Sequence, residues 1–379
     1  MMIGIVIFSS IICLLYFFIG RFNQSIGEIQ FKFIDIFLTL LLAISVLILM
    51  TANRLGYDAL NYARFFLYVK NTHINPFDYT YEFLSRVVIF VSGLFTDITY
   101  PKFQALLLTI LGGSLVFPIL KKYSVSTASV ISLYILSGSY AVDGMQFKNF
   151  IAVSFLLFAI YVLINGGRMS LPLYYIFLMI AILFHFSFTI YLFLPLIRTQ
   201  YIKNSSTIFP IIGMMTYLFF FFMSPVASAL LMILSRLPFL SKLAIYATQS
   251  ASYRSLVAVG IYLMVLFLLE YCRRYQEFLT NKTKHLLTSV LLVWRMLGLV
   301  VPFLYFANAP FRLYRNLFIL IFIVVVNTIL ELPVMSRARL KIIFSSLAVI
   351  GIIYYYPILL GQYIDIYYPV IDSGIYFWE

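Results

Sequence analysis

The sequence contains little charge for a chain of its length. Only 10% of its 379 residues are charged, whereas 63% are hydrophobic and the mean hydropathy is +1.02. A soluble domain is roughly a quarter charged and about half apolar. The chain therefore lacks the polar residues that a water-soluble fold needs for its surface. We expect one membrane-embedded domain over residues 1–379.

Cysteine and histidine are also scarce, with two and three copies. Cys13 lies in an apolar run and Cys272 stands beside two arginines, so neither predicts a disulfide framework or a thiolate metal site. The sequence has no metal-ligand cluster, phosphate-binding glycine loop or nucleotide fingerprint. We therefore expect no cofactor and no nucleotide-sugar or ATP donor, and we leave a divalent cation open.

Acidic residues are outnumbered by basic ones, 13 to 26, which gives a net charge of +13. In a soluble protein this balance would suggest nucleic acid, but the chain has no long basic run or stacking platform. In a membrane protein it indicates cytoplasmic connectors beside anionic lipid. We expect the lipid bilayer, and no nucleic acid, as a partner, while some basic residues could serve an anionic substrate.

Long apolar runs are what the sequence has in abundance. Those that could cross a bilayer fall near 2–20, 33–52, 102–120, 124–142, 150–166, 171–197, 207–234, 256–271, 286–306, 317–333 and 342–361. The run 171–197 exceeds the roughly 20 residues of one upright helix and has His185 near its middle. We interpret it as two short helices meeting at His185, with one long tilted helix as the alternative. The expected fold class is all-α, a polytopic membrane protein with about twelve transmembrane helices.

Basic residues predict the orientation of these helices. Just over half of the Lys and Arg residues lie in the connectors around 21–32, 121–123, 167–170, 198–206, 272–285 and 334–341. By the positive-inside rule these connectors face the cytoplasm, and both termini face outward. The outer loops are then about 53–101, 235–255 and 307–316. Residues 83–98 contain Arg86 and are short for a span, so we expect an amphipathic helix in the interface there.

The first outer loop contains the first candidate site residues. Asp58 and Glu82 lie beside membrane segments, where a carboxylate can act as a general base or hold a divalent cation. Tyr57, Tyr62 and Tyr81 could stack on sugar rings. The alternative is an interfacial aromatic belt with solvated acids.

Two further candidates lie near membrane segments. The turn from Asp143 to Lys148 places a carboxylate and an ammonium five residues apart, although it could be an ordinary connector. His185 has strongly apolar flanks, and ionisable residues at membrane depth tend to be functional. Imidazole suits proton transfer near neutral pH, with a hydrogen-bonded packing histidine as the alternative.

Arginines form the last candidate group. Arg312 and Arg315 are three residues apart, so on a helix they would share a face and could form a bidentate clamp for phosphate. Arg254 lies in another outer loop. The alternative for these residues is snorkelling to lipid phosphates. Arg295 is a further candidate for substrate binding, and because it lies within a span it needs a partner or a water-filled cavity.

The order of these motifs resembles a known family. A span is followed by Gly56-Tyr57-Asp58 and Tyr62, then by Tyr81-Glu82, and later by Ile-Ala-Ile-Leu-Phe-His-Phe-Ser at 180–187. This order over roughly 50–200 resembles the EpsG-like, Wzy-type polymerases of bacterial surface polysaccharides. One departure is Lys148, where the family usually has arginine, and lysine lacks the guanidinium fork.

The resemblance implies a GT-C-like glycosyltransferase at the outer face of the bacterial cytoplasmic membrane. Its substrate would be undecaprenyl-pyrophosphate-linked oligosaccharide, joined into O-antigen, capsule or exopolysaccharide. A flippase and a chain-length regulator of the same pathway would be partners. The alternatives are an O-antigen-ligase-like transferase and a flippase or transporter of lipid-linked glycans.

Within that reaction each candidate receives a role. Asp58 is the first-choice base, with Glu82 in reserve. His185 could instead be the base, or it could contact the pyrophosphate. The positive charges that would stabilise the departing pyrophosphate belong to Arg312, Arg315, Arg254 and Lys148.

Overall fold

The computed structural model describes most of the chain. The described residues are 2–20, 28–52, 57–72, 86–90, 98–234, 236, 253–306, 310–333, 336–359, 361 and 367. Within these ranges every regular element is a helix and no strand occurs. The chain is thus an all-α polytopic membrane protein, as the sequence predicted.

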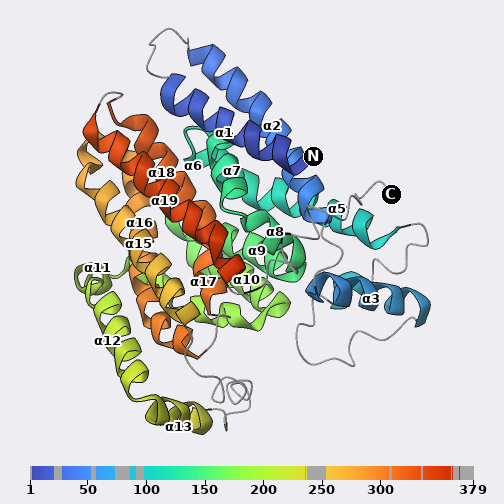
Figure 1. Cartoon of the computed structure of the whole chain (residues 1–379), viewed down its shortest axis with the longest axis vertical. Helices are drawn as coiled ribbons and strands as arrows, with labels where there is room; N and C mark the ends of the chain where they lie inside the picture. Colours follow the sequence, from blue (N-terminus) through green and yellow to red (C-terminus); the bar gives the residue numbers. More distant parts are fainter. Residues whose placement is uncertain are drawn as a thin grey trace.

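The described helices run along the chain from α1 to α19 (Figure 1). The first half contains α1 (Met2–Gly20), α2 (Glu28–Ala52), α3 (Tyr57–Thr72), α5 (Tyr100–Leu111), η2 (Gly112–Val116), α6 (Phe117–Tyr123), α7 (Thr127–Leu136), α8 (Ser139–Met145), α9 (Phe147–Asn165), α10 (Ser170–Phe184) and η3 (Phe186–Arg198). The second half contains α11 (Gln200–Ser205), α12 (Ile208–Phe222), α13 (Ser224–Leu234), α15 (Tyr253–Arg274), η5 (Gln276–Phe278), α16 (Asn281–Met296), η6 (Leu297–Tyr305), α17 (Phe311–Arg315), α18 (Phe318–Glu331) and α19 (Arg337–Leu359).

The apolar helices correspond to the expected spans. Six helical stretches in the described residues are long and apolar enough to cross a membrane, and the bent pair of α12 and α13 adds one more. Five shorter apolar helices complete the set: α1, α7, α10, η3 and α18. α18 is buried along nearly its whole length, so it lies at the centre of the bundle.

Three of the six connectors that were predicted to share one side lie together, those around 121–123, 167–170 and 198–206. Lys122 Nζ donates to Asn165 Oδ1 at 2.6 Å, and Arg198 donates to Ser170 Oγ at 2.8 Å. Ser126 Oγ donates to Asp35 at 2.7 Å. These bonds join the connectors around 121–123, 167–170 and 198–206, and they bring the start of α2 to the same place. We call this the basic end of the bundle, and its opposite the far end.

The run 171–197 forms two helices that meet at His185. α10 ends at Phe184, His185 is extended (φ −153°, ψ 111°), and η3 begins at Phe186. Because Arg198 bonds Ser170, the chain leaves the basic end along α10 and returns along η3. The prediction of two short helices is confirmed, and the single tilted helix is wrong.

The run 124–142 is interrupted, which the sequence analysis did not predict. α7 ends at Leu136, and α8 begins only after Gly138, whose φ of 69° is left-handed. A residue with a Cβ adopts that conformation at a cost, so the glycine permits the break. Consequently α7 spans about 15 Å at 1.5 Å per residue, roughly half of a hydrocarbon core.

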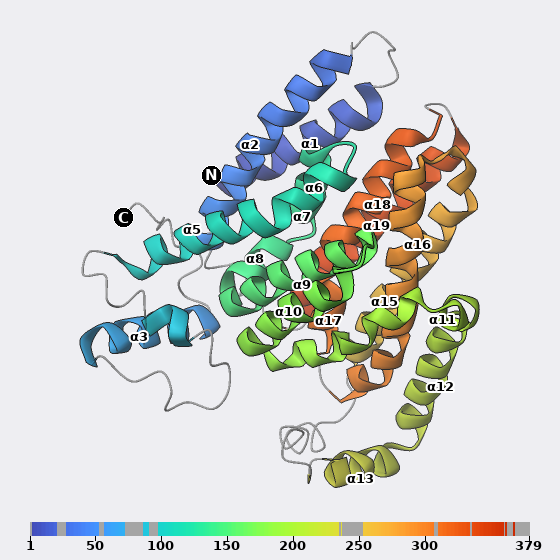
Figure 2. The ribbon, with the colours of Figure 1, turned by 180° about the vertical axis from the view of Figure 1, so that it is seen from behind.

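The run 207–234 is also not one straight span. α12 and the first part of α13 are bent by 104° between Phe222 and Ser224. Pro225, the second residue of α13, has no N–H to donate to the Phe221 carbonyl, which interrupts the helical hydrogen bonding between α12 and α13. Figure 2 shows α13 turned away from the bundle. α12 itself packs against η6, where a Cβ on Gly213 would lie 1.9 Å from the Gly298 carbonyl oxygen.

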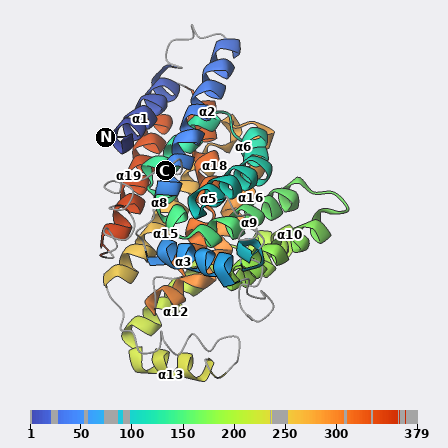
Figure 3. The same ribbon diagram turned by 90° about the vertical axis from the view of Figure 1, so that its right-hand side faces the viewer.

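The segment predicted to be the first outer loop contributes α3, which lies across the direction of α2 (Figures 1 and 3). α3 contacts α8 and α5 at the far end. Of the interfacial helix expected at 83–98, residues 86–90 are helical, and 91–97 lie outside the described residues.

Candidate active site

A buried ion pair lies at the far end. Arg315 Nη2 is 3.2 Å from Asp143 Oδ1, and the two side chains are only 9% and 10% exposed. Tyr134 donates its hydroxyl to the other Asp143 oxygen at 2.7 Å, and Arg315 donates to Gln146 Oε1 at 2.9 Å. The pair joins α8 to α17.

A row of amides and tyrosines continues from this pair. Asn149 donates to Asn316 Oδ1 at 3.3 Å, and Asn316 donates to the Tyr191 hydroxyl oxygen at 3.4 Å. That hydroxyl donates in turn to the Leu313 carbonyl at 2.6 Å. The α10–η3 hairpin is thereby tied to α17. We call the whole group the far-end polar cluster: Tyr134, Asp143, Gln146, Asn149, Tyr191, Arg315 and Asn316.

The cluster is not fully satisfied. Asn149 Oδ1 and Arg315 Nε are buried, and neither has a hydrogen-bond partner among the described residues. Buried polar groups are nearly always paired, so two orphans in one cluster indicate a place where a ligand or water completes the bonding.

Local sequence explains how Asp143 reaches Arg315. Gly144 sits against α2, where a Cβ would lie 2.6 Å from the Met50 carbonyl oxygen. Only glycine allows that approach without a shift of backbone. Gln104 of α5 donates to the Gly144 carbonyl at 3.1 Å and fixes α8 from the other side.

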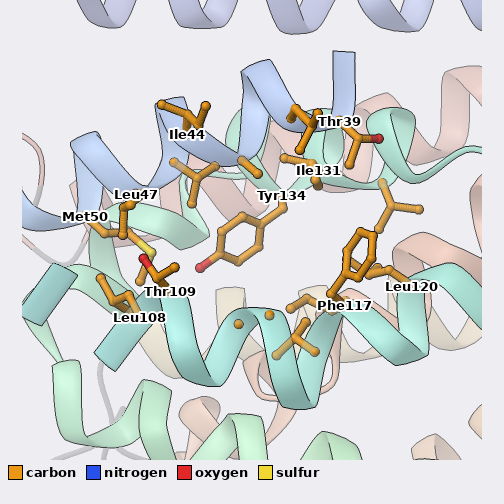
Figure 4. A pocket seen from close by; sticks show the side chains of 18 of the residues that line it. Thr39, Ile44, Leu47, Met50, Leu108, Thr109, Phe117, Leu120, Ile131 and Tyr134 are labelled. Carbon is orange, nitrogen blue, oxygen red and sulfur yellow. The ribbon is translucent and has the colours of Figure 1, made fainter. Parts of the chain in front are cut away.

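An apolar cleft of about 400 Å³ runs up to this cluster between α2 and the α5–η2–α6 helix. Its polar lining residues are Thr39, Thr109 and Tyr134. Figure 4 shows the Tyr134 ring projecting between the two helices. Along α2 the cleft extends from Thr39 to Met50, which is about 16 Å at 1.5 Å per residue.

The floor of the cleft on the η2 side is made by two glycines. A Cβ on Gly112 or Gly113 would meet nothing within 4 Å, so these residues leave the space open. Leu40 and Ile44 on the facing helix are exposed, which places the mouth of the cleft on the surface that lipid would cover.

The arginine clamp predicted from Arg312 and Arg315 has a different arrangement. Arg315 is engaged by Asp143 and Gln146 and is not free to bind phosphate in this state. Arg312 is half-buried on the same short helix and has no ion-pair partner in the described part of the chain. Its charge is close enough to act on Arg315.

Lys148 and Tyr62, two further candidates, contact each other, and His185 makes a separate contact. Lys148 Nζ lies 5.6 Å from the centre of the Tyr62 ring, a cation–π distance that links α9 to α3. His185 lies half-buried at the tip of the α10–η3 hairpin, with Nδ1 2.8 Å from Ser187 Oγ.

Arg295 does not belong to this site. Its Nε donates to Glu270 at 2.9 Å, its Nη2 also contacts that carboxylate, and Nη1 donates to Ser206 Oγ at 2.8 Å. The expectation that it needs a partner is confirmed. Every guanidinium nitrogen is engaged, and Ser206 belongs to the basic-end connector, so a role of Arg295 in substrate binding stays a prediction.

The remaining candidates stay predictions. The backbones of Tyr57, Asp58 and Arg254 lie in α3 and α15, but their side chains lie outside the described residues, as do Tyr81 and Glu82 entirely. No group of three or more potential metal ligands occurs among the residues that the structure describes.

Comparison with known proteins decides the family. A model of the EpsG family matches residues 36–369, which is most of the chain. The chain belongs to the EpsG family. This EpsG-family membership makes it a polymerase-like protein of polysaccharide biosynthesis and confirms the resemblance found in the sequence. No curated protein and no solved structure matches it.

Most of the far-end polar cluster in this EpsG-family chain was not predicted from the sequence. The turn from Asp143 to Lys148 was a candidate, but Asp143 itself received no role. Asn149 and Asn316 are single amides that directly precede the apolar runs 150–166 and 317–333, and that position was the available signal, whereas Tyr191 is one of 30 tyrosines and gave none. Their mutual contacts depend on which helices pack together, which one sequence does not reveal.

Proposed function

We propose that the chain joins undecaprenyl-pyrophosphate-linked oligosaccharide repeat units into a surface polysaccharide at the outer face of the bacterial cytoplasmic membrane. One observation carries the proposal: Tyr134 lines the apolar cleft, and its hydroxyl donates to Asp143 of the Asp143–Arg315 pair. This juxtaposition suits a substrate that has a hydrocarbon chain and an anionic group in one molecule.

The proposed reaction is a GT-C-like glycosyl transfer. A base takes the proton of an acceptor hydroxyl, and the hydroxyl oxygen bonds to the anomeric carbon of the lipid-linked chain. The bond from that carbon to the pyrophosphate oxygen breaks, and pyrophosphate leaves with the electron pair. The leaving group supplies the energy, so no ATP is needed.

Positive charge at the far end would stabilise the negative charge of the departing pyrophosphate. Arg312 has no ion-pair partner among the described residues, and Lys148 and Arg315 lie at the same end of the bundle. An arriving pyrophosphate would compete with Asp143 for the Arg315 guanidinium and offer an acceptor to its unpaired Nε. Arg254 remains a further candidate for this role.

The base is assigned from sequence alone. Asp58 is the first choice and Glu82 the reserve. Asp58 follows the span 33–52, and Glu82 directly precedes the predicted interfacial helix 83–98. His185 is the alternative, because its imidazole lies at the tip of the hairpin that is tied to α17.

A transporter of lipid-linked glycans would need a polar route for the glycan. The cleft instead is apolar along its length, which suits the lipid part of the substrate. A ligase would use the same lipid-linked donor and a different acceptor, so the product distinguishes it from a polymerase.

The test is complementation of a deletion strain that lacks this protein. The strain should accumulate single-repeat glycan, and the wild-type gene should restore long chains. Gly113→Leu fills the cleft and should lower polymer at least roughly tenfold, because two or more displaced methylenes cost about 0.8 kcal/mol each. Gly351→Leu is the matched control, since Gly351 also has nothing within 4 Å of a Cβ but lies on α19. Normal polymer with Gly113→Leu would contradict the assignment of the cleft.

A further inference from the structure

A second cavity, of about 430 Å³, lies at the basic end between α15 and α19. It shares no lining residue with the cleft beside the far-end polar cluster. The residues that line it are Met264, Phe267, Leu268, Glu270, Tyr271, Arg274, Ser345, Ala348 and Val349.

The lining changes from apolar to charged toward the basic end. On α15, Met264 and Phe267 come first and Arg274 is the last residue of the helix. α19 runs the opposite way, so Ser345 is nearer the basic end and Val349 lies deeper. The two helices therefore present the same gradient to the cavity, with a polar mouth and an apolar interior.

The mouth carries net positive charge. The one acidic lining residue, Glu270, is already bound by Arg295 and by Arg273 at 2.9 Å. Arg274 has no ion-pair partner among the described residues, and neither has Lys341, which lies one helical turn before Ser345 on the same face. Tyr271 brings a hydroxyl to the same mouth.

We propose that this cavity binds a phospholipid with an anionic headgroup, such as phosphatidylglycerol. The phosphate lies against Arg274 and the Tyr271 hydroxyl, with Lys341 beside the headgroup. An acyl chain follows Met264 and Phe267, whose side chain is 68% exposed. Basic pockets between membrane helices bind anionic headgroups in this way. The site is separate from the proposed polymerase site and does not depend on it.

The experiment measures lipid retained by the purified full chain. The protein is reconstituted in nanodiscs of equal phosphatidylglycerol and phosphatidylcholine and then extracted in mild detergent. The retained lipid is quantified by mass spectrometry. Wild type should retain phosphatidylglycerol selectively, and Arg274→Gln should retain about tenfold less, because a charge-assisted hydrogen bond is lost. Lys203→Gln, an exposed basic-end residue outside the cavity, should behave as wild type.

Two results would overturn the proposal. One is equal retention of phosphatidylcholine and phosphatidylglycerol by wild type. The other is undiminished phosphatidylglycerol in a folded Arg274→Gln variant. If that variant does not fold, the wild-type chain alone decides: added phosphatidylglycerol should raise its melting temperature more than phosphatidylcholine does, and equal shifts reject the site. Polymer formation is not part of the readout, so failure here leaves the proposed function untouched.

Discussion

At the scale of single residues, Arg315 differs most from its expected role. A free clamp for phosphate was predicted, yet the guanidinium is buried between Asp143 and Gln146. An arginine held this way is positioned before substrate arrives, and its exchange of Asp143 for a pyrophosphate would make binding depend on the ligand's charge. Arg312, half-buried on the same helix, is the more direct contact for an arriving anion.

Variants of the Asp143–Arg315 ion pair can show whether the pair contributes to polymer formation or only to the stability of the fold. Asp143→Asn leaves a buried guanidinium without its counter-charge, which typically costs about 3–5 kcal/mol. The double variant Asp143→Asn, Arg315→Gln removes both charges and should regain much of the lost thermal stability, but polymer should stay absent. Melting temperature and polymer length are measured on the same preparations. Polymer at the wild-type level in the stable double variant would remove the pair from the mechanism.

Asp58 and His185 give opposite forecasts for the base. If Asp58 takes the proton, Asp58→Asn should slow turnover by on the order of 10²–10⁴, with His185→Gln mild. If His185 is the base, the severity reverses. Turnover of purified lipid-linked units by both variants distinguishes them. Near-normal rates in both would show that the base lies elsewhere.

At the scale of helices, the hairpin at 171–197 could be predicted because its length and His185 both break the pattern of one upright span. The interruption at Gly138 could not, since Ser137-Gly138 leaves the hydropathy of 124–142 unchanged. The bend after Phe222 had a visible signal in Pro225, but proline is also tolerated inside membrane helices. Apolar runs therefore predict where the helices lie, but they do not predict where a helix is interrupted.

Gly144 is the element-scale test of how α8 is placed. Gly144→Ala pushes a methyl against the Met50 backbone and should shift α8, with a cost of about 1–3 kcal/mol. Because Asp143 moves with the helix, polymer should fall by more than the change in protein level explains. Gly260→Ala, at an open position on α15, is the control. The comparison is polymer per amount of membrane-inserted protein.

At the scale of the whole molecule, the sequence correctly predicted the fold class, the family and the proximity of the connectors around 121–123, 167–170 and 198–206. It did not predict the far-end polar cluster, because Gln146 and Arg315 are 169 residues apart and meet only through helix packing. The partner of Arg295 was not predicted for the same reason, since Glu270 lies on another helix.

Cysteine labelling tests the predicted orientation of the chain in the membrane. Single cysteines at Asn71 on α3 and Asn281 at the start of α16 are both exposed, and the native Cys13 and Cys272 are buried. A membrane-impermeant maleimide added to intact cells should label position 71 and not position 281, because the basic end faces the cytoplasm under the positive-inside rule. Labelling of position 281 in intact cells would reverse the orientation.

The most direct measurement is polymer formation by the purified protein from purified undecaprenyl-pyrophosphate-linked repeat units, without ATP or nucleotide sugar. Wild type should produce a ladder of repeat multiples, with chelator making no difference. The folded Asp143→Asn, Arg315→Gln variant should leave the single unit unchanged. A wild-type chain that produces no ladder, or a double variant that produces the same ladder, would contradict a polymerase centred on the far-end polar cluster.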